Sequence, residues 1–227
     1  MGTEVRPAFY ALRTGGWRDY VTVLHVPYTA WSLSYVALGA ALAPHFHTGR
    51  LVWTLAAFAL ALGVAAHMLD ELHGRPLRTE IPAAVLVALA VASLAAACAI
   101  GVWASFAWDE PALLGLVAVG GLVTPAYNLE WFGGLLHNAW GFALSWGAFP
   151  VLTAYFAQDG TIRVAAVAAA AFATAMTVVQ RTLSTPVRHA RRTLGTTESV
   201  QAMERSLRIL TWANVLLGCA VVLARLT

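Results

Sequence analysis

A histidine and two carboxylates stand close together in His67-Met-Leu-Asp-Glu71, at the end of a long apolar stretch. His67 precedes Asp70 by three residues and Glu71 by four, so a helix would carry all three on one face. Helix bundles use a carboxylate three or four residues from a histidine to hold metal ions. We therefore predict a metal site of His67, Asp70 and Glu71, to which Glu130 and His137 can add ligands.

The same residues also have a simpler interpretation. Asp70 and Glu71 can end a helix at the level of the lipid headgroups and pair with Arg75 or Arg78. His137 follows a Gly-Gly turn and can be an interfacial residue at a helix start. The sequence leaves both interpretations open.

A second group of polar residues falls at the same end of the expected helices. Ionisable groups at membrane depth are costly, so each implies a partner or a function. Arg181 and Arg188 can bind a phosphorylated substrate, because a guanidinium pairs bidentately with phosphate. The alternative is that these arginines mark topology and contact lipid headgroups. The predicted substrate-binding residues are Arg75, Asn128, Gln180, Arg181 and Arg188.

The elements that must position these groups are membrane-spanning helices. Of the 227 residues, 59% are hydrophobic and only 11% are charged, against about 25% charged in soluble domains. Gaps between charged residues leave seven apolar runs, most of them near the roughly 20 residues that cross a bilayer. They are 20–49, 51–69, 81–108, 111–129, 131–158, 164–180 and 209–224. We expect an all-α integral membrane protein of about seven transmembrane helices, with one domain over 1–227. Residues 1–19 form an amphipathic segment and 20–226 the bundle.

The arginines predict the orientation. The basic residues are all arginine, and an N-terminus inside leaves eleven on the cytoplasmic side and three, Arg50, Arg163 and Arg225, on the other. This positive-inside bias predicts a cytoplasmic N-terminus. The basic charge then indicates contact with anionic lipids rather than nucleic acid. The alanine-rich, lysine-free composition is typical of a GC-rich prokaryote, so we expect a prokaryotic inner or plasma membrane.

Around these residues, over about 20–195, the chain resembles the UbiA prenyltransferase superfamily. Helix 51–69 runs into a polar motif followed by Arg75-Pro76 and Ile81-Pro82, as in that family. Ala126-Tyr-Asn-Leu and Gly141-Phe-Ala-Leu-Ser-Trp-Gly-Ala-Phe-Pro150 resemble the family's fourth and fifth helices. The resemblance implies a UbiA-like bundle, an isoprenoid diphosphate as substrate, and magnesium held by aspartates. Asp70, Glu71 and Tyr127 would then be the catalytic residues.

The chain departs from the family at its two aspartate motifs. In the first, Asn-Asp-x-x-Asp-x-x-x-Asp, the aspartate positions hold His67, Asp70 and Gly74. The place of the second motif, 180–188, contains no carboxylate. Magnesium prefers hard oxygen ligands, whereas imidazole favours transition metals. The expected cofactor is therefore a divalent metal: magnesium by resemblance, or a transition metal if the histidines are ligands.

The sequence is compatible with three functions. The first is a metal-dependent intramembrane enzyme acting on a prenyl diphosphate or other isoprenoid lipid, by prenyl transfer or cyclisation. The second is a transition-metal-dependent membrane oxidase or hydroxylase on the same scaffold. The third is a non-catalytic lipid-binding membrane subunit.

Overall fold

The computed structural model describes residues 7–195 and 197–227 and is entirely helical over them. The elements are α1 (Trp17–Val23), α2 (Val26–Leu42), α3 (Thr48–Phe58), η1 (Ala59–Ala66), α4 (His67–Leu72), α5 (Ala83–Ala107), α6 (Leu113–Asn128), α7 (Trp131–Gly134), α8 (Ala139–Ala143), η2 (Leu144–Ala148), α9 (Phe149–Asp159), α10 (Val164–Leu194) and α11 (Glu198–Leu226). The two η elements are π-helical. The prediction of an all-α fold is confirmed.

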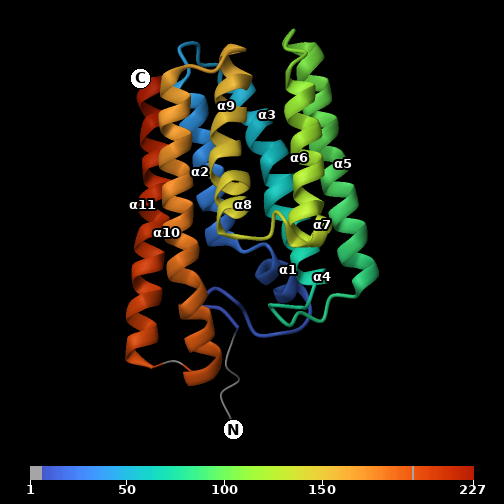
Figure 1. Ribbon diagram of the computed structural model, residues 1–227, viewed down its shortest axis with the longest axis vertical. Coiled ribbons are helices and arrows are strands. Elements are labelled where there is room, and N and C mark those ends of the chain that lie inside the picture. Colours follow the sequence, from blue (N-terminus) through green and yellow to red (C-terminus); the bar gives the residue numbers. More distant parts are fainter. Residues whose placement is uncertain (1–6, 196) are drawn as a thin grey trace.

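Within this described part, the seven apolar runs become seven long rods packed side by side (Figure 1). They are α2, α3–η1–α4, α5, α6, α8–η2–α9, α10 and α11. Four are long and apolar enough to cross a membrane by length and composition: Thr48–Leu72, Ala83–Ala107, Val164–Arg191 and Glu198–Leu226. The chain is therefore an integral membrane protein; its orientation stays a prediction.

Small residues let the central rods approach closely. A Cβ added at Gly39 in α2 would collide with the carbonyl oxygen of Val151 in α9. One at Gly218 in α11 would lie 2.9 Å from Ser34 in α2. Beside it, the Asn214 amide donates to the Ser34 hydroxyl at 2.7 Å. Lipid offers no hydrophobic drive for helix association, so such close backbone contacts and interhelical hydrogen bonds hold the rods together.

Polar residues at the end that carries the C-terminus tie loops together. Arg50 donates to the carbonyl of Ala157 at 3.0 Å, and Arg225 donates to the carbonyl of Pro44 at 2.9 Å. The His45 ring donates to Asp159 at 2.7 Å. This hydrogen bond is the main reason why the pKa of Asp159 lies below its ordinary value. The hydrogen-bonding groups at this end are therefore paired with one another inside the protein.

The expected amphipathic segment, 1–19, contacts the rest of the protein over its described part. Residues 1–6 of that segment lie outside the described residues, and 7–16 form no helix. Ala8 and Ala11 are buried in a cluster with Leu77 and Ile81. Asp19 holds the segment by accepting hydrogen bonds from the amides of Gly15, at 2.9 Å, and of Glu80, at 2.8 Å. Segment 7–16 therefore packs on the protein, at the end of the bundle opposite the C-terminus (Figure 1).

Helix α10 is longer than the sequence predicts. The apolar run 164–180 is followed by Pro186, and a proline usually ends a helix, but α10 continues through it to Leu194. The proline ring removes one backbone hydrogen bond, the one to the carbonyl of Thr182 four residues earlier. The Thr185 hydroxyl donates to the neighbouring carbonyl of Arg181 at 2.9 Å. Beyond the proline, Arg191 pairs with Glu204 of α11, so the two helices stay packed together.

Candidate functional site

A polar cavity of about 460 Å³ opens among the helices, beside α4 and the C-terminal end of α6. Its walls come from α2, η1, α4, α6, α8, η2 and α10. Eight of the predicted site residues line this cavity: His67, Asp70, Tyr127, Asn128, His137, Gln180, Arg181 and Arg188. The structure thus brings residues from 67 to 188 to one place.

The α10 wall is a stripe of polar side chains. Arg181, Ser184, Thr185 and Arg188 follow the spacing i, i+3, i+4, i+7, and all four line the cavity. Residues so spaced share one face of a helix. The stripe exists because α10 continues through Pro186, which keeps Arg188 on the same face as Arg181.

Arg181 is held in a fixed position. Its guanidinium donates to the Tyr127 hydroxyl at 2.6 Å and lies 4.9 Å from the centre of the Phe142 ring. Tyr127 is almost fully buried, and its ring stacks on His137 with the centroids 4.7 Å apart. A guanidinium has five N–H donors, so most of those on Arg181 remain for a ligand.

Asp70 and Arg188 share the cavity without pairing. Arg188 lies within electrostatic range of Asp70, Tyr127 and His25. Yet over residues 7–195 and 197–227 neither Asp70 nor Arg188 forms a hydrogen bond or an ion pair. The expected alternative, in which Asp70 pairs with Arg75 or Arg78, is likewise not seen among these residues. Both charges are therefore available to a ligand.

Two histidine rings stack at the cavity wall. The centroids of His25 and His67 lie 4.3 Å apart, with their planes 11° from parallel. The Nδ1 atom of His67 lies 3.2 Å from the carbonyl oxygen of Gly63. A carbonyl only accepts, so Nδ1 carries the proton and Nε2 keeps a lone pair. His67 therefore presents an acceptor at the cavity wall.

Two predicted site residues form hydrogen bonds with the loop after α4 and do not line the cavity. Glu71 is fully buried and accepts three hydrogen bonds: from the Leu77 amide at 2.9 Å, the Thr79 amide at 2.8 Å and the Thr79 hydroxyl at 2.9 Å. Arg75 donates to the carbonyl of Ile81 at 2.6 Å. Neither lines the cavity. Glu71, expected as catalyst and ligand, and Arg75, expected to bind substrate, therefore lie in the loop contacts and not in the cavity lining.

Glu130 also lies outside the cavity lining. It is half-exposed, at 3.8 Å from both His73 and His137. His137 itself directs Nδ1 to the carbonyl oxygen of Tyr127 at 3.0 Å. The helix containing His67 thus carries one carboxylate, Asp70, into the cavity, because Glu71 turns to the loop.

The expected five-ligand metal site is not assembled. Among the residues described, no group of three or more histidine, cysteine, aspartate or glutamate side chains is placed to hold a metal ion. The cavity instead combines one carboxylate with two guanidinium groups. Magnesium is usually bound through one or two carboxylates together with substrate phosphates and waters, and the cavity lining offers one carboxylate for that role, Asp70.

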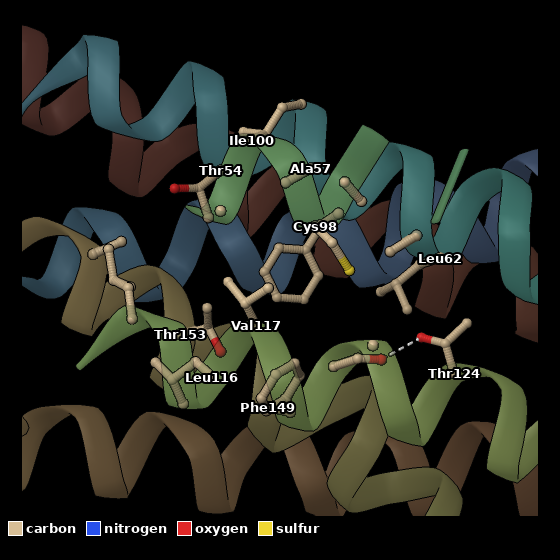
Figure 2. Close-up of a pocket in the computed structure, with 18 of the residues that line it drawn as sticks. Thr54, Ala57, Leu62, Cys98, Ile100, Leu116, Val117, Thr124, Phe149 and Thr153 are labelled. Carbon is tan, nitrogen blue, oxygen red and sulfur yellow. Dashed lines mark hydrogen bonds between the residues drawn. The ribbon is translucent and has the colours of Figure 1, made fainter. Parts of the chain in front are cut away.

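An apolar groove adjoins the polar cavity. It has a volume of about 100 Å³ and runs between α3–η1, α5, α6 and η2–α9. Leu62, Cys98 and Val117 reach into it (Figure 2). Leu62 of η1 and Trp146 of η2 line both the groove and the cavity. The two spaces therefore meet at the two π-helical segments, an irregularity often found at functional sites.

Several cavity residues were missed by the sequence analysis. Tyr28 and Thr29 of α2 line the cavity, but nothing in their spacing distinguishes them from ordinary packing residues. Ser184 and Thr185 could have been found from their spacing relative to Arg181, had the helix been extended through Pro186.

The structure is similar to that of a UbiA homolog from Archaeoglobus fulgidus solved with Cd2+ bound, with a TM-score of 0.54 and 18% sequence identity. The match covers 92% of this chain and 85% of that one. No protein-family profile and no curated protein matches the sequence significantly. The class defined by the fold is thus a UbiA-like membrane helix bundle, and the resemblance read from the sequence is confirmed at the level of the fold.

Proposed function

We propose that this chain is an intramembrane enzyme of the UbiA type that acts on an isoprenoid lipid. The observation that supports this most strongly is the junction of a polar, arginine-containing cavity with an apolar groove at Leu62 and Trp146. An amphipathic molecule with a charged head and a hydrocarbon tail would satisfy both spaces. The tail would bury apolar surface in the groove, and the head would meet Arg181 and Arg188.

The reaction we propose is cleavage of an isoprenoid diphosphate, followed by prenyl transfer or cyclisation. Stabilising charge on the departing diphosphate is the largest catalytic contribution that such a site can make. Arg181 and Arg188 are the cationic groups of the cavity wall. Asp70 and the Tyr127 hydroxyl, together with the lone pair of His67, are the groups that can orient an acceptor or move a proton.

The two alternative functions have less support. The transition-metal oxidase needs a ligand set that the described residues do not assemble. The non-catalytic lipid-binding subunit shares the cavity and groove with the proposed enzyme, so a measurement of turnover separates the two.

The groove can be tested with a matched pair of variants on α5. Ala97 is buried and lines the groove, whereas the adjacent Ala96 is exposed on the outer face. Ala97→Phe fills the groove, and Ala96→Phe adds the same ring outside it. We expect detergent-purified wild type and Ala96→Phe to bind farnesyl diphosphate and release pyrophosphate from it, and Ala97→Phe to bind it about tenfold or more weakly.

Binding without pyrophosphate release across a range of prenyl acceptors would favour the non-catalytic subunit. Equal binding by both variants would remove the groove from the proposal.

A further inference from the structure

The cavity wall on α10 carries positive charge where the resembled family carries a second aspartate motif. Segment 180–188 contains Arg181 and Arg188 and no carboxylate. The structure places both arginines in the cavity that also contains Asp70. In the family motif, aspartates hold a metal and the metal holds the diphosphate; the residues of this chain lack that carboxylate set.

The charge balance of the cavity favours an anion. Its two guanidinium groups face one carboxylate, Asp70. Arg188 has no ion-pair or hydrogen-bond partner within the described ranges, whereas Arg191, one turn further along, is buried against Glu204. Arg188 is partly buried and faces the cavity, so its guanidinium is placed to pair with an anionic ligand there.

We propose that the cavity binds a phosphate or diphosphate group directly through Arg181 and Arg188, without a bridging divalent cation. This rests on the proposed function for the rest of the substrate. The two arginines are seven residues apart, roughly 10 Å along the helix axis at 1.5 Å per residue, so their long side chains can converge on a group between them. Each can present a planar fork of donors to phosphate oxygens.

The neighbouring groups support arginine as the donor. The hydroxyls of Ser184 and Thr185 already donate to the carbonyl of Arg181, so they have no proton left for a ligand. The hydrogen bond from Arg181 to the Tyr127 hydroxyl fixes the position of the guanidinium. The other N–H donors of Arg181 remain for a ligand. The guanidinium groups of Arg181 and Arg188 on α10 would supply the positive charge that a metal would otherwise bring to a diphosphate.

The test is calorimetric titration of the detergent-purified full chain with inorganic pyrophosphate, with EDTA and with added magnesium. We expect the same affinity in both. Arg188→Ala should weaken binding about tenfold or more, and Arg188→Lys should recover only part of it, because lysine keeps the charge but loses the fork. Arg205→Ala is the matched control: Arg205 is exposed on α11 and lies outside the cavity, so its removal should leave binding unchanged.

Binding that requires magnesium, or equal loss in Arg188→Ala and Arg205→Ala, would overturn the proposal, as would no pyrophosphate binding in either buffer. A separate competition experiment identifies which molecule carries the phosphate group. In it, farnesyl diphosphate and dioctanoyl phosphatidic acid each compete with pyrophosphate in the presence of EDTA. Metal-free pyrophosphate binding with no gain from the farnesyl tail would keep this inference and reject the isoprenoid substrate. Tight binding of farnesyl diphosphate that depends on magnesium would reject this inference and keep the isoprenoid substrate.

Discussion

Replacing Glu71 with glutamine should destabilise the protein without changing the ligand site. The Glu71 carboxylate is fully buried and uses both oxygens: Oε2 accepts from the Leu77 amide, and Oε1 accepts from the amide and hydroxyl of Thr79. A glutamine carbonyl can replace only one oxygen. If it keeps the two bonds to Thr79, its NH2 group faces the Leu77 N–H, donor against donor.

The expected cost follows from that geometry. One hydrogen bond to a charged acceptor is lost, and a buried donor is left unpaired, which together cost about 3 kcal/mol. For a chain of this size, we expect the Tm in detergent to fall by roughly 6–12 °C. Glu80→Gln is the control, since it removes the same charge from the exposed far end of this loop and should leave the Tm nearly unchanged.

Pyrophosphate affinity separates the two roles of Glu71. At a temperature where Glu71→Gln is folded, its affinity should match that of wild type. An unchanged Tm combined with lost ligand binding would refute the structural role and restore Glu71 as a site residue.

Three further predictions concern packing, the site and topology. Gly39→Ala should destabilise by about 1–3 kcal/mol, measured by thermal unfolding, because its Cβ meets the Val151 carbonyl; Gly49→Ala, with open space around it, should not. Tyr127→Phe frees the guanidinium of Arg181 and should weaken pyrophosphate binding about threefold to tenfold, with an unchanged Tm. Ser199→Cys in a cysteine-free background should react with an impermeant reagent only after cells are opened; labelling of intact cells would reverse the orientation.

The helical rods could be predicted from the sequence because charge is costly in lipid, so gaps between charged residues mark the spans. The four longest spans and the UbiA-like arrangement agree with that analysis. The end of α10 could not be predicted, since a proline usually breaks a helix and only packing against α11 shows that this one does not. That error hid the polar stripe from Arg181 to Arg188.

For the site, the sequence could predict which residues share a helix face, but not which partners their side chains contact. Helical spacing placed His67 and Asp70 on one face of a helix, and both line the same cavity. The same spacing could not show that Glu71 would turn toward Leu77 and Thr79, because those hydrogen bonds depend on how the following loop folds back. Spacing along a helix fixes which residues share a face, whereas their partners come from the rest of the chain.

The most direct test of the central claim is photolabelling with farnesyl diphosphate that carries a benzophenone at the far end of its tail. If the head lies beside Arg188 and the tail passes Leu62 and Trp146 into the groove, mass spectrometry should find crosslinks within residues 94–104 or 116–124. Unlabelled farnesyl diphosphate should compete for them. Crosslinks confined to the outer face of α11, or insensitive to competitor, would contradict an isoprenoid site in this part of the bundle.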